Sequence, residues 1–289
     1  PESAFKSIER PTIQEIEGAI KRVRPIPQIA LKIIRMIRDA NISLKDISEE
    51  LRTDQVLSAK VIRLCNSAFL GLGQKIDAVD RAMVFLGEKQ FLQLIISSSV
   101  EDFFPGTEKG YSLCKGGIYK HALGTALVSE VLADFAGTVS SDIAYTAGLL
   151  HDIGKVVLDQ NMASAYPLFY RRIQEDGISL TVVEREEFGI DHAEAGGRLG
   201  EAWALPDNLI DVIRHHHDPE KATVDPQLSY VVYLADLIMS LFLAGQELER
   251  LNTNELAARL KAAGIKPEQF PRVIDSIPNR IFHDSLLLS

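Results

Sequence analysis

The sequence predicts an all-α protein, and three observations support this prediction. Apolar residues recur at three- and four-residue spacing along most of the chain. No convincing run alternates apolar and polar residues as a half-buried strand does, and proline or glycine breaks divide the chain into helix-sized pieces. With 289 residues, of which 46% are hydrophobic and 25% charged, the chain can form one large domain or two small ones.

The predicted helices follow in chain order from these repeats and breaks. The repeats with helical spacing are Ile29, Ile33 and Ile37; Leu57, Val61 and Leu64; and Leu123, Leu127 and Val131. The breaks are "VRPIP" (23–27), "GLG" (71–73), "FPG" (104–106), "GG" (116–117), "LP" (205–206) and "DP" (218–219 and 225–226). The most apolar stretch, "YVVYLADLIMSLFLA" (230–244), is too short to span a bilayer comfortably and contains Asp236, so it is predicted to be a buried helix.

The chain divides chemically near residues 103–116, "FFPGTEKGYSLCKG", where proline, glycine and polar residues gather. Upstream of this segment there is no histidine. Downstream lie all seven, which are His121, His151, His192, His215, His216, His217 and His283. We therefore expect a chemically quiet first part and a second part built around polar groups.

The net charge and the cysteine content limit the expected binding partners and the expected cellular compartment. The net charge of −9 argues against direct binding of nucleic acid or of an anionic membrane surface. The two cysteines, Cys65 and Cys114, lie in otherwise helical patterns and suggest no disulfide framework. A cytoplasmic protein is the expectation.

The second part contains candidate metal ligands on several predicted helices. They are His121, the pair His151 and Asp152 in "GLLHDIGKVVL" (148–158), His192 in "DHAEAGGRLGEAW", His216 and His217 at the end of "PDNLIDVIRHHHDP", and Asp236. Any one of them alone is better explained as a hydrogen-bonded core or surface residue. Together, imidazoles and carboxylates without thiolates are the ligand set for iron, manganese or zinc. Asp152 is the best-placed bridge if two ions bind.

The order of these residues resembles the H…HD…D signature of the HD superfamily of metal-dependent phosphohydrolases. "HDIGK", "HAEAGGRL" and "IRHHHDP" are similar to the binuclear site of its HD-GYP type. This resemblance implies a first ion held by His121, His151, Asp152 and Asp236. It implies a second ion held by Asp152, His192, His216 and His217.

The first part of the chain resembles the HDOD domain, a bacterial regulatory relative of those enzymes. The specific pieces are "LCNSAF", "AMVFLG" and "WALPDNLIDVIRHHHDPE", whereas "RTDQVLS" departs from the family's usual acidic residue plus proline. The resemblance implies an HDOD domain over about 20–220, with an N-terminal helical part to about 105 packed on an HD-like part from about 111. Residues 221–289 would add helices that complete the HD-like bundle.

Two functions, and one plainer alternative, follow from these resemblances. Many HDOD domains are signalling modules with eroded metal ligands, which implies a regulatory module that binds a signalling protein or a nucleotide-type ligand. The ligand positions kept here favour instead a phosphohydrolase that acts on a nucleotide or cyclic nucleotide through a metal-bound hydroxide. "DPEKATVDPQ" replaces the Gly-Tyr-Pro run that accompanies cyclic di-GMP hydrolysis. A helical scaffold whose buried polar residues pair without metal ranks last.

Two further expectations concern the cofactor and catalysis. Two divalent ions are expected, iron or manganese first, with zinc, nickel or magnesium as alternatives. Asp152 and Lys155 are the candidate catalytic residues, and Lys155 would hold a phosphate oxygen. An exposed lysine after a helix end is the equally weighted alternative for Lys155. The oligomeric state cannot be derived from the sequence.

Overall fold

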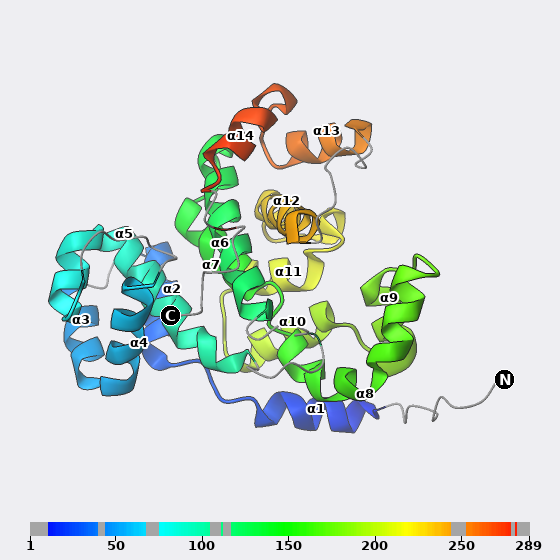
Figure 1. Ribbon diagram of the computed structural model, residues 1–289, viewed down its shortest axis with the longest axis horizontal. Helices are drawn as coiled ribbons and strands as arrows, with labels where there is room; N and C mark the ends of the chain where they lie inside the picture. Colours follow the sequence, from blue (N-terminus) through cyan, green and yellow to red (C-terminus); the bar gives the residue numbers. More distant parts are fainter. Residues whose placement is uncertain are drawn as a thin grey trace.

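A computed structural model describes residues 11–39, 44–67, 75–104, 111, 117–243, 253–278 and 281. Within these residues the chain is helical and no strand occurs, so the predicted all-α class is confirmed (Figure 1). Cys114 and His283 lie outside the described residues, and Cys65 is buried and free. No helix in the described chain combines the length and the apolar character needed to cross a membrane.

The N-terminal helices form one side of the molecule in Figure 1, apart from the first of them. Their bounds are α1 (Ile13–Arg22), α2 (Gln28–Asp39), α3 (Leu44–Thr53), α4 (Gln55–Cys65) and α5 (Val79–Val100), followed by the short η1 (Glu101–Phe103). The predicted repeats supply their buried faces: Ile29 and Ile33 of α2 are buried, as are Leu57, Val61 and Leu64 of α4. The N-terminus of α4 is capped by the Asp54 carboxylate, which accepts a hydrogen bond from the Leu57 backbone N–H at 2.9 Å.

The remaining helices surround the histidine-rich region. They are α6 (Gly117–Ala136), α7 (Ser141–Leu150), α8 (Lys155–Gln174), α9 (Leu180–Phe188), α10 (His192–Ala202), α11 (Asp207–His215), η2 (Pro219–Lys221), α12 (Pro226–Leu243), α13 (Thr253–Ala262), η4 (Pro267–Gln269) and α14 (Phe270–Ser276). The predicted buried helix over 230–244 is α12. The domain boundaries near 105–111 and 220 stay predictions.

Close helix contacts depend on small residues. A Cβ at Gly148 of α7 would lie 2.6 Å from Ser129 Oγ and 2.8 Å from Thr125 O of α6. A Cβ at Gly154, which precedes α8, would lie 1.8 Å from the backbone oxygen of His192 at the start of α10. These positions let α6 pack on α7, and α8 on α10, at backbone distance.

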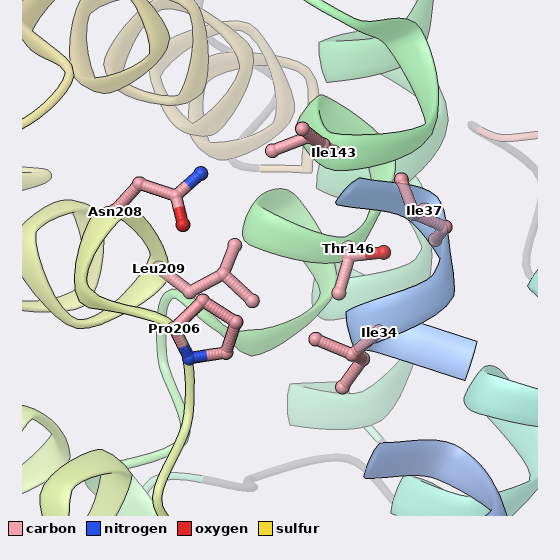
Figure 2. Close-up of a pocket in the computed structure, with 7 residues that line it drawn as sticks. All are labelled: Ile34, Ile37, Ile143, Thr146, Pro206, Asn208 and Leu209. Carbon is pink, nitrogen blue, oxygen red and sulfur yellow. The ribbon is translucent and has the colours of Figure 1, made fainter. Parts of the chain in front are cut away.

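Side chains from α5 to α7 join the two parts of the molecule. The hydroxyl groups of Ser97 on α5 and Tyr145 on α7 are 2.9 Å apart, and Tyr119 of α6 donates to the Ser97 carbonyl oxygen at 2.9 Å. Lys89 of α5 forms a 2.8 Å ion pair with Glu130 of α6. Helices α2 and α7 and the start of α11 line a small, largely apolar pocket (Figure 2).

Helix α1 packs on the second part of the chain. It lies beside α8 and α10 (Figure 1), and it buries Ile16 and Ile20. A capping box starts the helix, because Thr12 and Glu15 bond each other's backbone N–H groups. The chain therefore begins against the helices that carry the histidines and then crosses to α2.

Candidate metal centre

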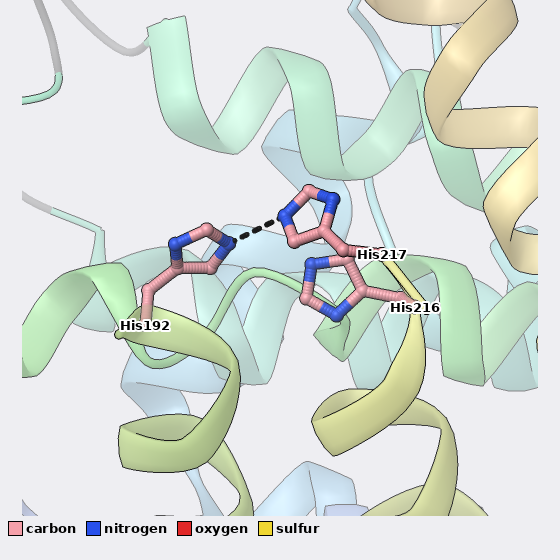
Figure 3. Close-up of side chains that lie close together, drawn as sticks. All are labelled: His192, His216 and His217. Atoms are coloured by element: carbon pink, nitrogen blue, oxygen red, sulfur yellow. Dashed lines mark hydrogen bonds between the residues drawn. The ribbon is translucent and has the colours of Figure 1, made fainter. Parts of the chain in front are cut away.

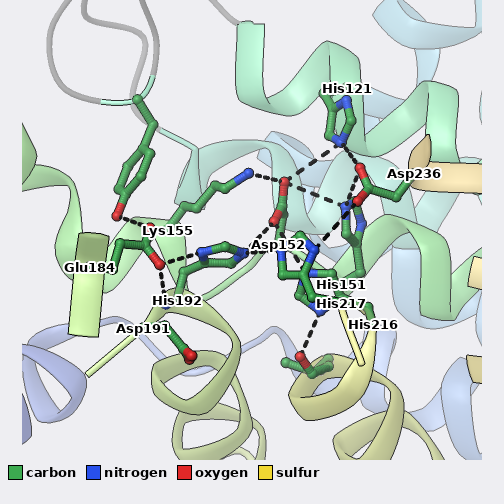
Figure 4. Close-up of polar contacts among 12 residues, drawn as sticks. His121, His151, Asp152, Lys155, Glu184, Asp191, His192, His216, His217 and Asp236 are labelled. Carbon is green, nitrogen blue, oxygen red and sulfur yellow. Dashed lines mark hydrogen bonds and ion pairs between the residues drawn. The ribbon is translucent and has the colours of Figure 1, made fainter. Parts of the chain in front are cut away.

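Each candidate ligand lies at a defined point of the helical framework. His121 lies in the second turn of α6 and Asp236 in the middle of α12. His151 and Asp152 form the tight turn between α7 and α8, in which the Lys155 N–H donates to the Asp152 carbonyl oxygen at 2.9 Å. All seven candidate ligands, the four above with His192, His216 and His217, converge on one centre (Figure 4).

The three remaining histidines come from the ends of two neighbouring helices (Figure 3). His192 is the first residue of α10, because the Asp191 carboxylate caps this helix by accepting from the Glu194 N–H at 2.8 Å. His216 and His217 follow the last residue of α11, before Pro219 prevents its continuation. One ligand atom from each of these three imidazoles lies within 4.8 Å of the others.

The two oxygen atoms of Asp152 face different groups of histidines. Oδ2 lies 3.4 Å from His151 Nε2 and 3.7 Å from His121 Nε2. Oδ1 lies 3.3 Å from His192 Nε2 and 3.7 Å from His216 Nε2. Asp152 is 1% exposed and stands between the two groups, which is the position expected of a bridging carboxylate.

Two histidines are held in the tautomer that a metal ligand requires. Nδ1 of His151 donates to the Gly148 carbonyl oxygen at 2.7 Å, and Nδ1 of His216 donates to the Ile213 carbonyl oxygen at 2.8 Å. With the proton on Nδ1, each Nε2 carries a lone pair directed at the centre. Both imidazoles are fully buried.

The centre contains buried acceptors that lack hydrogen bonds within the described chain. They are His151 Nε2, Asp152 Oδ1 and His216 Nε2. An unsatisfied buried acceptor costs about 1–3 kcal/mol, and here three of them converge. A cation between them would satisfy all three, and a donor set of imidazole nitrogens and carboxylate oxygens suits iron, manganese or zinc. The residues present therefore fit a metal centre.

Electrostatics at the first group of ligands favour a cation. Burial alone would raise the pKa of Asp152, but Lys155 and His151 hold it well below its usual range. Partial burial would likewise raise the pKa of Asp236, but His121, whose Nε2 is 2.9 Å from Asp236 Oδ1, lowers it well below its usual range. Both carboxylates are ionised at neutral pH. They also raise the pKa of His151 despite its burial.

Two imidazoles of the second group, His216 and His217, are neutral near pH 7 in the absence of metal. Burial lowers the pKa of His216 well below its usual range and that of His217 to about 4. Near pH 7 no proton has to leave these two imidazoles before an ion binds.

Lys155 is not the exposed lysine that the alternative interpretation described. Its side chain is 16% exposed, and Nζ donates to Asp152 Oδ2 at 2.5 Å. Nζ also lies 5.9 Å from the centre of the Tyr111 ring. Burial lowers the pKa of Lys155, but Asp152 and Asp236 more than offset this effect, so the ammonium group stays charged.

Glu184 and Tyr111 belong to the site but were missed from the sequence. Glu184 of α9 is fully buried and accepts a hydrogen bond from His192 (Figure 4). It also accepts one from the Tyr111 hydroxyl. A signal for Glu184 existed: it lies four residues after Leu180 and four before Phe188, on the apolar face of its helix. Tyr111 lies in a segment with no periodic pattern and offered no signal.

The fold and the site together define an all-helical protein with an HD-type cluster of histidines and aspartates. A family model of the HDOD domain matches residues 23–219. The chain belongs to the HDOD family, as the sequence resemblance indicated.

Three solved structures share the fold. An HDOD domain protein of unknown function from Geobacter sulfurreducens has a TM-score of 0.78 at 22% identity, covering 95% of this chain and 97% of that one. A candidate phosphohydrolase from Shewanella amazonensis has a TM-score of 0.72 at 23% identity, covering 93% and 96%. A candidate signal transduction protein from Marinobacter aquaeolei has a TM-score of 0.71 at 21% identity, covering 93% and 63%. At these identities the likeness concerns the fold alone.

Curated relatives are longer than this chain. An uncharacterised protein of Treponema pallidum is 26% identical over 235 residues, which are 78% of this chain and 44% of that protein. Ribonuclease Y of Deinococcus radiodurans is 30% identical over 121 residues, which are 42% of this chain and 16% of the ribonuclease. The chain therefore spans less than half the length of either relative.

Proposed function

We propose that this chain is a metal-loaded HDOD module of bacterial signal transduction, with two divalent ions in its HD-type centre. The observation that carries the proposal is the division of the Asp152 carboxylate between two groups of histidines. His121, His151 and Asp236 would hold one ion with Oδ2. The other ion would be held with Oδ1 by the second group, His192, His216 and His217.

The regulatory role is supported by family membership and by the way the parts are joined. The contacts of Ser97 and Lys89 with α6 and α7 connect the N-terminal helices to the elements that carry His121 and His151. A ligand or protein partner that prefers one arrangement of these helices would shift the population toward it. Iron or manganese is the expected metal, since both suit nitrogen and oxygen ligands.

Elemental analysis of the purified protein tests the metal centre directly. We expect about two iron or manganese ions per chain after metal supplementation under reducing conditions. His151 belongs to the first group of ligands and His217 to the second. His151→Ala and His217→Ala should therefore each lower the metal content. His215→Ala is the matched control, because His215 lies in the same histidine run but its Nε2 faces Asp211 at 3.6 Å. Wild-type protein without stoichiometric metal would refute the proposal.

A metal-dependent phosphohydrolase is the second candidate. It is favoured by the solvent-facing rim of the centre, where the side chains of His121, Asp236 and His217 are 13%, 15% and 34% exposed. When bound, the two ions would lower the pKa of a water molecule and neutralise phosphate oxygens. Lys155 would supply a further positive charge to a phosphate oxygen at this rim.

Hydrolysis assays separate the two candidates. The metal-loaded wild type is tested against cyclic dinucleotides and phosphomonoesters beside Asp152→Ala. Turnover that disappears in Asp152→Ala would establish the enzyme and overturn a purely regulatory role. No turnover by fully loaded protein would leave the regulatory module.

A further inference from the structure

Glu184 is a carboxylate enclosed in the protein beside the second group of histidines. Its side chain is 0% exposed, and it accepts three hydrogen bonds. Oε2 accepts from the backbone N–H of His192 at 2.9 Å and from Nδ1 of the same residue at 2.7 Å. Oε1 accepts from the Tyr111 hydroxyl at 2.6 Å. A buried carboxylate is tolerated only when its lone pairs are satisfied in this way.

The contact with Glu184 determines what His192 presents to the centre. Because the carboxylate is an acceptor, the imidazole proton stays on Nδ1, and Nε2 is directed at the centre 3.3 Å from Asp152 Oδ1. His151 and His216 are oriented by neutral backbone carbonyls instead. Among these three imidazoles, His192 alone has a buried carboxylate behind it, and His192 belongs to the second group.

We propose that Glu184 is a positioning residue that sets the affinity of the second ion, and of that ion alone, through His192. This inference rests on the proposed two-ion centre. A carboxylate behind a ligating imidazole fixes its tautomer and makes Nε2 a stronger donor. Tyr111 donates a hydrogen bond to Glu184 Oε1 and so keeps Glu184 Oε2 aligned with the His192 imidazole. Loss of such a partner lowers metal affinity about 10–100-fold.

Titration of metal-free protein with Mn²⁺ tests this assignment. Glu184→Gln keeps the shape of the side chain but removes its charge, and it should weaken one of two binding events about 10–100-fold. Tyr111→Phe should weaken the same event by a smaller factor, because the Glu184 charge remains, and it provides a second test if Glu184→Gln folds poorly. Glu186→Gln is the control, since Glu186 lies on the same helix but pairs with Arg172 at 2.5 Å.

Two single-ion backgrounds identify which ion responds. In His121→Ala the remaining ion lies at the second group, and adding Glu184→Gln should weaken it. In His217→Ala the remaining ion lies at the first group, and Glu184→Gln should leave its affinity unchanged. Equal weakening in both backgrounds, or no weakening in either, would overturn the inference. A wild type that binds no Mn²⁺ would instead refute the two-ion centre itself.

Discussion

At the scale of single residues, Asp152 and Lys155 form an ion pair, but they relate differently to the candidate metal centre. Asp152 faces both groups of histidines. Lys155 contacts this carboxylate at Asp152 Oδ2 and not at Oδ1. The lysine is therefore a charge beside the centre rather than one of its metal ligands. If the protein is an enzyme, this position suits the binding of a phosphate oxygen.

If the protein is a phosphohydrolase, Lys155→Ala should retain both metal ions and lower turnover roughly 10²-fold, the effect of losing one preorganised cationic contact. Metal content and the hydrolysis rate are measured on the same sample. Lys155→Met is the companion variant, because it keeps much of the aliphatic stem that approaches Tyr111 and removes only the charge. Unchanged hydrolysis in both variants would remove Lys155 from the catalytic residues.

At the scale of single elements, most of the candidate metal ligands lie at the ends of helices and not along their faces. His151 and Asp152 follow α7, His192 starts α10, and His216 and His217 follow α11. Helix ends can meet at one point only if the helices approach closely. Gly154 permits this approach where α8 passes the start of α10, because any Cβ there would overlap the His192 backbone.

Gly154→Ala should destabilise the protein by at least about 2 kcal/mol, since the overlap is with backbone and not with a flexible side chain. It should also reduce metal content, because α10 carries His192. Thermal unfolding and elemental analysis measure the two effects. Gly18→Ala in α1 is the control: its Cβ would meet only the end of the Arg22 side chain at 3.2 Å. The control should be neutral or stabilising by about 0.5–1 kcal/mol. Wild-type stability in Gly154→Ala would contradict this account.

At the scale of the whole molecule, the centre joins α6, α12 and the ends of α7, α10 and α11. Removing a cation would leave buried acceptors facing one another. Bound metal should therefore stabilise the native state as a whole and not only its local loops.

Chelation of the metal should lower the midpoint of thermal unfolding. An ion at 100 times its dissociation constant contributes about 2.7 kcal/mol of stability, which corresponds to roughly 4–5 °C per ion for a protein of this size. Scanning calorimetry with and without chelator measures the shift. His217→Ala, which loses a ligand, should show a smaller shift, whereas His215→Ala should behave as the wild type. Identical midpoints with and without chelator would count against a metal that links the helices.

The sequence by itself determined the all-α class, the family and the residues that converge. Periodicity states which face of a helix is buried, as Leu57 and Val61 show, and unusual polar residues such as Asp236 stand out against an apolar pattern. The structure brings all seven predicted ligands together.

Only the tertiary structure decided which partners those residues meet. The packing of α1 on α8 and α10, the division of the Asp152 oxygens, and the bonds from Glu184 to His192 and Tyr111 all join segments far apart in the chain. Periodicity identifies the buried face of one helix at a time, but it does not say which other helix packs against that face. The physical reason is that such contacts depend on interhelical distances and angles, and these are set by packing of the whole core.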